Sequence, residues 1–245
     1  MPGAAAEAAP FHLRAGQARR WHRGALALAA AALLAIVGAL MRSRGQLDAW
    51  TLAHWIGKPL ATAVLVALVW RHGGDAPPRL HRAVLAGLVC SLAGDVLLML
   101  SPRLFVGGLL AFLAAHLFYL RAFTADTRLF ARPLALALLA GVGGLILAFL
   151  WSGVAPVLRG PVLAYVAVLV AMAAQAVARW RVHPGARAGM AAAGGLLFVV
   201  SDSLLAIDRF RTPIAAAPLW VLGTYWAAQW GIAQSVRGEG GPGRA

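Results

Sequence analysis

The chain alternates long apolar runs with short polar segments, and the apolar runs have the length of membrane-spanning helices. A bilayer core about 30 Å thick is crossed by roughly 20 apolar residues in a helix. Because lipid offers no partner for an unpaired backbone group, each such run is predicted to be helical. Eight runs meet this criterion: 25–41, 49–70, 83–100, 104–120, 133–158, 160–178, 188–207 and 212–236.

The segments that connect these runs are short and rich in Arg, Pro and Gly, as residues 71–79 illustrate. None is long enough to hold a soluble domain. The pattern therefore predicts an all-α, polytopic membrane bundle of eight transmembrane helices over 24–236. A basic tail over 1–23 precedes the bundle, and a flexible tail over 237–245 follows it.

The composition supports a membrane protein and excludes an ordinary soluble one. Of the 245 residues, 61% are hydrophobic and 12% are charged, whereas soluble domains are about 45–50% apolar and about 25% charged. Cys90 is the only cysteine, which excludes an intramolecular disulfide and a cysteine-based zinc site.

The basic excess predicts an orientation in the membrane. The chain has 22 Lys and Arg against 8 Asp and Glu, a net charge of +14. In a soluble protein this excess would suggest nucleic acid as a partner, but membrane proteins concentrate Arg in cytoplasmic loops. On the side of both termini there are 15 arginines, against 6 on the other side. We therefore expect cytoplasmic termini, a multi-pass protein of a bacterial inner (cytoplasmic) membrane and no nucleic-acid partner; the oligomeric state stays open.

Acidic residues inside spans are the most informative polar positions, since a carboxylate near the bilayer centre costs about 2.5–3.5 kcal/mol on insertion scales. Six of the eight acids lie in tails, in loops or at a span end. Among them, Asp208 is expected to pair with Arg209 and Arg211 at the surface. Asp95 in the third span and Asp202 in the seventh are the two that lie deep.

Three further polar side chains lie at a similar depth. At a rise of 1.5 Å per residue, both deep carboxylates lie roughly 18–21 Å from the cytoplasmic ends of their spans. Lys58, His116 and Tyr225 fall in the middle half of the second, fourth and eighth spans. Five polar side chains on five helices are therefore predicted to face one polar cavity.

Neighbouring residues support this cavity. Pro59 lacks an N–H donor, which predicts a kink in the second span. Gln229 lies one helical turn after Tyr225, and Tyr119 follows His116 by three residues, so each pair shares a helix face.

These polar residues and their neighbours form five short motifs, which are in chain order Lys58-Pro59-Leu60, Gly94-Asp95-x-Leu97-Leu98, His116-x-x-Tyr119, Ser201-Asp202-x-Leu204-Leu205-Ala206 and Thr224-Tyr225-Trp226-x-x-Gln229. In this order the motifs resemble those of the lysoplasmalogenase family, also called YhhN-like membrane proteins. At Trp226 this chain departs from the family pattern, which more often has a second Tyr there.

The resemblance implies a membrane hydrolase that cleaves the vinyl ether bond of lysoplasmalogens. The products would be a fatty aldehyde and glycerophosphocholine or glycerophosphoethanolamine. It also implies that Asp95 and Asp202 carry the acid and base catalysis, much as paired carboxyls do in glycosidases. The expected supporting residues are Lys58, His116, Tyr119, Tyr225 and Gln229. A lysophospholipid substrate and the bilayer are the expected partners, with no metal and no cofactor.

Other functions remain open at this point. Intramembrane Asp, Lys and His side chains also form proton relays in transporters, so a proton-coupled transporter is the alternative. A non-catalytic lipid-binding or scaffold protein is a third class. The two deep carboxylates also have a structural interpretation, as groups paired with Lys58 or with Ser hydroxyls.

Overall fold

The computed structural model describes residues 11–43, 47–73 and 76–237, and within these residues it contains helices and no strand. The predicted all-α class is confirmed. Residues 1–10 and 238–245 of the two predicted tails lie outside the described residues. The helices are α1 Phe11–Met41, α2 Ala49–His72, α3 Pro78–Leu100, α4 Phe105–Phe123, α5 Pro133–Leu150, α6 Pro156–Val182, α7 Ala186–Phe210 and α8 Ala217–Gln234, with a short 3₁₀ helix, η1, over Pro102–Leu104.

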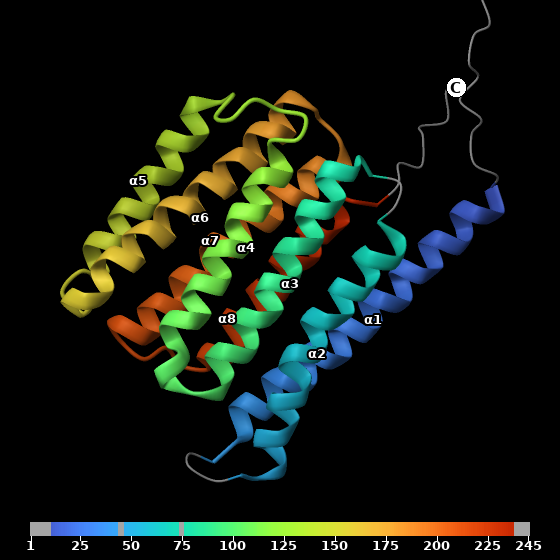
Figure 1. The fold of residues 1–245 in the computed structure, drawn as a ribbon. Coiled ribbons are helices and arrows are strands. Elements are labelled where there is room, and N and C mark those ends of the chain that lie inside the picture. The colour runs from blue at the N-terminus through green and yellow to red at the C-terminus, as the bar shows by residue number, and fades with distance from the viewer. Residues whose placement is uncertain (1–10, 44–46, 74–75, 238–245) are drawn as a thin grey trace, which may run out of the picture.

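The helices pack as one bundle, with α1 and α2 at one side and α5 at the other (Figure 1). The first seven are long and apolar enough to cross a membrane. The last, α8, has 18 residues and does not meet the same hydropathy criterion. It packs against α7 and α1, and the polar side chains that lower its hydropathy point into the protein, as described below.

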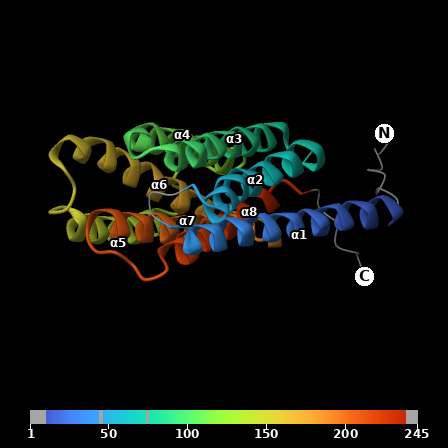
Figure 2. The ribbon, with the colours of Figure 1, turned by 90° about the horizontal axis from the view of Figure 1, so that it is seen from below.

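The start of α1 and the end of α8 lie at the same end of the bundle (Figure 2). The rings of Trp21 on α1 and Trp230 on α8 meet edge to face, 5.8 Å apart. The guanidinium of Arg237, just beyond α8, lies 5.3 Å from the Trp21 ring. Both described ends of the chain therefore share one end, as eight helices of alternating direction require. Which end faces the cytoplasm stays a prediction.

Two helix boundaries differ from the predicted ones by more than five residues. The fifth run, 133–158, was expected to be one helix, but α5 ends at Leu150 and α6 begins at Pro156. The turn passes through Gly153, where a Cβ atom would collide with the carbonyl oxygen of Phe210. Ser152, Gly153 and Pro156 are residues that favour turns, but the predicted fifth run extended across them. At the other end of the chain, α1 starts within the predicted N-terminal tail.

Glycines allow α7 and α8 to approach closely. A Cβ atom on Gly194 would lie 2.6 Å from the carbonyl oxygen of Ala228, and one on Gly231 would lie 2.6 Å from that of Met190. Small residues at such contacts let helix backbones pack together in lipid. The close approach brings the face of α7 that carries Ser201 beside α8, where the Ser201 hydroxyl donates to the carbonyl of Val221 at 3.0 Å.

The connection between α4 and α5 is attached to α6 by buried polar groups. The Gln175 amide donates hydrogen bonds to the carbonyls of Phe123 and Arg128. Asp126 accepts three hydrogen bonds from the Arg179 guanidinium, two from Nε at 2.9 and 3.0 Å and one from Nη2 at 2.7 Å. Burial raises the pKa of Asp126, but the bonds to Arg179 outweigh it, and the net pKa is lowered. This ion pair fixes the connection at the end of the bundle where the chain termini lie.

The α7–α8 contact predicts a strong difference between two glycines of α8. Gly231→Ala places a methyl group against the α7 backbone, and overpacking of this kind costs about 1–3 kcal/mol. Gly223→Ala is the matched control, because nothing lies within 4 Å of a Cβ atom at that position. We expect thermal unfolding in detergent to show a lower melting temperature for Gly231→Ala and no decrease for Gly223→Ala. Equal melting temperatures would contradict the close contact.

Candidate active site

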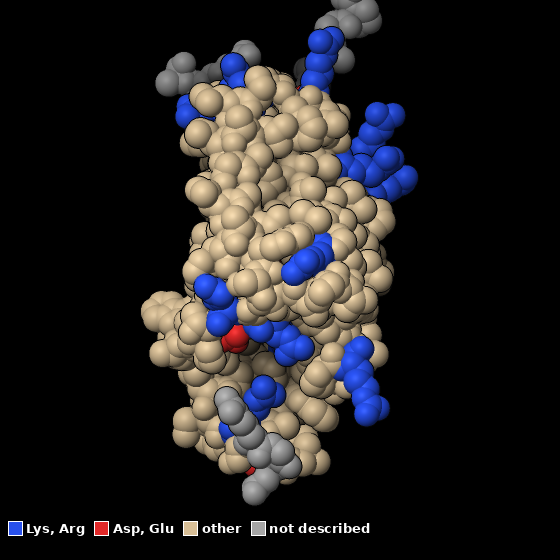
Figure 3. Space-filling model, turned by 90° about the vertical axis from the view of Figure 1, so that its left-hand side faces the viewer, with Lys and Arg blue, Asp and Glu red and all other residues tan. Residues whose placement is uncertain are grey.

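A cavity of about 340 Å³ lies inside the bundle and is lined by residues from α1 to α8. Its walls are mainly apolar. Its lining includes residues near the ends of α1, α3 and α7 and the starts of α4 and α8, so the cavity reaches the end of the bundle opposite the chain termini, and we call this part of it the mouth. Figure 3 shows a hollow with basic side chains around it in the lower part of the face in view. The polar side chains that line the interior include Lys58, Asp95, Tyr165, Asp202 and Tyr225.

Asp95 is the most buried acid of the cavity, with 1% of its surface exposed. Its Oδ2 accepts hydrogen bonds from the hydroxyls of Thr62 at 2.6 Å and Tyr225 at 2.8 Å. The Nζ of Lys58 lies 3.7 Å from Oδ1. The indole N–H of Trp226 donates to the Thr62 hydroxyl at 3.3 Å. Trp226, where the chain departs from the family pattern, therefore contacts one of the hydrogen-bond donors of Asp95. Helices α2, α3 and α8 thus meet around one carboxylate.

Tyr119 and Gln229 do not line the cavity but lie behind Tyr225. The Gln229 amide donates to the Tyr225 hydroxyl at 3.2 Å, and the Tyr119 hydroxyl donates to Gln229 Oε1 at 2.6 Å. Tyr119 in turn lies 3.4 Å from the Ser91 hydroxyl. This chain of hydrogen bonds holds the Tyr225 O–H toward Asp95.

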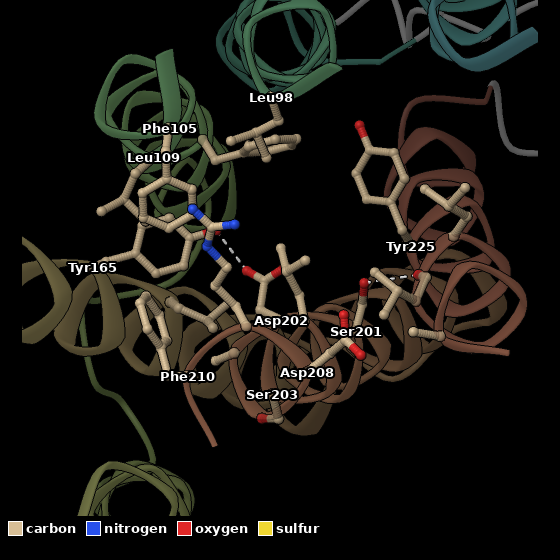
Figure 4. Close-up of a pocket in the computed structure, with 18 of the residues that line it drawn as sticks. Leu98, Phe105, Leu109, Tyr165, Ser201, Asp202, Ser203, Asp208, Phe210 and Tyr225 are labelled. Carbon is tan, nitrogen blue, oxygen red and sulfur yellow. Dashed lines mark hydrogen bonds between the residues drawn. The ribbon is translucent and has the colours of Figure 1, made fainter. Parts of the chain in front are cut away.

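Asp202 lies in a different environment on the same cavity. It points into the cavity and accepts a hydrogen bond from the Tyr165 hydroxyl (Figure 4), at 2.6 Å from Oδ2. Among the described residues no Lys or Arg forms an ion pair with it. Asp202 therefore has one hydroxyl donor, whereas Asp95 has two hydroxyl donors and an ammonium group.

His116 is brought beside Asp202 but not into the cavity. Its ring packs edge to face on Phe198 at 4.5 Å and on Tyr165 at 5.2 Å. The Nε2 atom lies 4.0 Å from Asp202 Oδ2, and neither ring nitrogen has a hydrogen-bond partner within the described residues. The structure thus places His116 behind the cavity wall, although its depth is the one that the sequence predicted.

No hydrogen bond or ion pair joins the two carboxylates in the part of the chain that the structure describes. Edge-to-face rings pack at the cavity wall instead: Phe112 lines the cavity and lies 5.7 Å from Tyr225, and the fully buried Phe198 lies 5.6 Å from Tyr225. Within the described residues, no group of three His, Cys, Asp or Glu side chains could share a metal ion. The site is a pair of separately held carboxyl groups on one apolar cavity.

Sequence reasoning missed Tyr165, which lies on α6 and donates to Asp202. The sequence did contain a signal for it, because tyrosine is rare in this chain, with three in all. All three hydroxyls, those of Tyr119, Tyr165 and Tyr225, belong to the hydrogen-bond networks of the two carboxyl groups. A tyrosine in the interior of an otherwise apolar span is therefore as informative here as an acid.

The expected surface pairing of Asp208 is wrong. Its Oδ1 accepts a hydrogen bond from the backbone N–H of Ile214 at 2.8 Å, and in the described part of the chain neither Arg209 nor Arg211 forms an ion pair with it. This backbone N–H, in the α7–α8 connection, takes the place of the expected arginine as the partner of the carboxylate. Arg209 instead packs on the Phe105 ring, 5.1 Å from its centre, and lines the cavity mouth with Arg42.

Comparison with known proteins identifies relatives over most of the chain. The profile of the YhhN family matches residues 53–236. Lysoplasmalogenase TMEM86B of Homo sapiens is 39% identical over 142 residues, which cover 58% of this chain and 58% of the human protein. The same-named protein of Sus scrofa is 38% identical over 189 residues, covering 74% and 76%. The uncharacterized membrane protein YhhN of Escherichia coli O157:H7 is 30% identical over 189 residues, covering 76% and 88%. No solved structure matches the chain significantly.

The pairing of Lys58 with Asp95 predicts a coupled effect on stability. Removing one partner of a buried ion pair costs about 3–5 kcal/mol, because the other charge is left uncompensated. At a distance of 3.7 Å we expect Lys58→Met to lie at the lower end of that range. The double variant Lys58→Met/Asp95→Asn should recover most of the loss. Denaturant unfolding in detergent measures both, and additive losses would contradict the pairing.

Proposed function

The chain belongs to the YhhN family, and we propose on that premise that it is a membrane hydrolase that cleaves the vinyl ether bond of lysoplasmalogens. Relatives named lysoplasmalogenase, 38–39% identical, support the substrate class. The observation that carries the proposal is the placement of two carboxyl groups, from α3 and α7, on one apolar cavity inside a membrane bundle. The products would be a fatty aldehyde and glycerophosphocholine or glycerophosphoethanolamine.

The proposed chemistry is acid-catalysed hydration of the vinyl ether. A proton is added to the alkenyl carbon remote from the oxygen, and the carbon bonded to oxygen becomes part of an oxocarbenium ion. Water adds to that carbon and loses a proton, which gives a hemiacetal. The hemiacetal then loses the glycerol oxygen as an alcohol and becomes the aldehyde, so that one water is consumed. Two carboxyl groups divide such work in glycosidases, which pass through a similar cation.

Asp202 is the group that we assign as proton donor. An ionised carboxylate in an apolar cavity is costly without a charged partner, and within the described residues Asp202 has only the Tyr165 hydroxyl as a donor. The protonated form is therefore favoured. With Oδ2 accepting from Tyr165, the Oδ1 atom is left to carry the proton into the cavity.

Asp95 is the group that we assign as the ionised carboxylate. Lys58 and the two hydroxyl donors of Thr62 and Tyr225 stabilise its negative charge. A fixed negative charge stabilises the oxocarbenium ion as it forms, and it can accept the proton that the attacking water loses. General acid or base catalysis by one such group contributes about 10²–10⁴-fold to a rate.

The cavity also supports binding of a single-chain lipid. The hydrocarbon chain would lie along the apolar walls, and the phosphate would lie at the mouth. Arg42 and Arg209 line that mouth, and both are exposed, so a phosphate at the mouth could reach both guanidinium groups. Guanidinium groups suit phosphate because they offer planar, bidentate donors.

We place the protein in a bacterial cytoplasmic membrane with both termini in the cytoplasm. The distribution of arginines supports the orientation, and the Escherichia coli relative, of which the match covers 88%, supports a bacterial membrane. In this orientation the cavity opens toward the non-cytoplasmic side of the membrane. Lysolipids would then enter from that side.

The assignment predicts loss of activity in two variants. Asp95→Asn and Asp202→Asn should each reduce the release of fatty aldehyde by about 10²–10⁴-fold, since each removes one acid or base group. The assay uses purified protein in detergent with alkenyl lysophospholipids of both headgroups. Asp48→Asn is the matched control, because Asp48 caps α2 outside the cavity and asparagine also caps helices.

Two results would contradict the proposed function. One is full aldehyde release by both cavity variants while they remain folded. The other is transport without chemistry: lysolipid crosses the membrane of proteoliposomes that contain the wild-type protein, and no aldehyde is released. That result would favour a transporter.

The proposed orientation predicts which loops are accessible from outside the cell. In a Cys90→Ser background, Thr212→Cys lies in the α7–α8 connection and Leu129→Cys in the α4–α5 connection, and both positions are exposed. We expect a membrane-impermeant maleimide to label Thr212→Cys in intact bacteria and Leu129→Cys only after lysis. The reverse pattern would place the termini outside.

A further inference from the structure

A second hollow, of about 600 Å³, lies between α3 and α4 at the end of the bundle where the chain termini lie. We call it the basic groove. It is separate from the cavity that holds Asp95 and Asp202, and the two have no lining residue in common. Three of its lining residues are arginines from two helices, Arg79 and Arg82 on α3 and Arg121 on α4.

The three arginines are not neutralised within the protein as far as the structure describes it. Their side chains are exposed, and none forms an ion pair with a carboxylate among residues 11–43, 47–73 and 76–237. No acidic residue within those ranges lines the groove. The preference for cytoplasmic arginines accounts for the end at which they lie, but it does not require three of them to converge on one hollow.

The backbone adds to the attraction for an anion. The α3 helix begins at Pro78, and its N-cap residue Pro77 provides no side-chain acceptor for the first N–H groups. A helix N-terminus carries partial positive charge, and Pro78 itself lines the groove. The arginines and the helix start therefore favour the same kind of ligand.

An apolar path leads from the arginines toward the middle of the bundle. Phe118 lines the groove one turn before Arg121. Farther from the helix ends, Val89 on α3 and Leu117 and Leu110 on α4 are 49–52% exposed. At helical spacing, Arg82 and Val89 share one face of α3, as Arg121 and Leu117 share one face of α4. A ligand that follows these residues must be charged at one end and apolar at the other.

We propose that the basic groove binds an anionic phospholipid of the bilayer, with its phosphate between the three arginines and an acyl chain along α3 and α4. Basic pockets between membrane helices bind anionic headgroups in this way, and each Lys or Arg near the membrane surface strengthens the binding of anionic lipid. The site takes a lipid of the surrounding leaflet and does not depend on the proposed hydrolase function.

The test measures lipid binding by the full-length protein in detergent, with native mass spectrometry as the readout. We expect the wild-type protein to retain one phosphatidylglycerol in preference to phosphatidylcholine. The triple variant Arg79→Gln/Arg82→Gln/Arg121→Gln should bind phosphatidylglycerol roughly 10- to 100-fold more weakly. The matched control is Arg128→Gln/Arg132→Gln/Arg181→Gln, which removes the same charge from exposed positions outside the groove and should retain binding.

A second variant tests the groove without changing its charge. Ala86 lines the groove, and Ala86→Trp should fill it and weaken binding of phosphatidylglycerol. Four results would overturn the proposal: equal binding of phosphatidylcholine, an equal loss in the control variant, unchanged binding in both groove variants, or full competition by inorganic phosphate. The last would indicate a site for a free anion.

Discussion

A carboxylate inside a membrane must find its polar partners within the protein, and Asp95 is where this constraint is strongest. Its partners come from Lys58 and Thr62 on α2 and from Tyr225 on α8, so three helices that are distant in the sequence meet at one group. A shift of any of these helices by one residue would leave a buried charge with fewer donors, at a cost of several kcal/mol. The arrangement of α2, α3 and α8 is therefore tied to the satisfaction of one side chain.

Apolar packing alone would not determine this arrangement, because lipid tails are as apolar as leucine side chains. Two other devices set the positions of the helices. One is the close approach at small residues, as at Gly194 and Gly231 between α7 and α8. The other is hydrogen bonding between helices, as from Tyr119 on α4 to Gln229 on α8. Both act at the level of the cavity or along the helices that line it, so the features that hold the bundle together also shape the site.

How much of the fold and of the site could be predicted from the sequence depends on the same property of the bilayer, its lack of polar partners. Helices were predictable because lipid excludes other backbone structures, and the depth of a residue was predictable because each residue adds 1.5 Å. The rotation of each helix about its axis was not predictable, since most of its faces are apolar. His116 shows the difference, because its depth matches that of Asp202 while its ring packs behind the cavity wall on Phe198. The turn at Gly153, which packs against Phe210, was missed for a different reason: Ser152, Gly153 and Pro156 favour a turn, but the long apolar run was predicted to continue through them.

The arginines of the two ends have different physical explanations. An excess at one end is required for insertion in a fixed orientation, so an arginine there needs no further cause unless several converge on one hollow. The other end carries few arginines, and insertion does not call for any of them. Two of these, Arg42 and Arg209, line the mouth of the cavity. Since orientation does not account for these two, their position supports the proposed binding of a phosphate group at the mouth. This reasoning places the phosphate of the proposed lysolipid at the mouth and its vinyl ether deeper, toward Asp95 and Asp202.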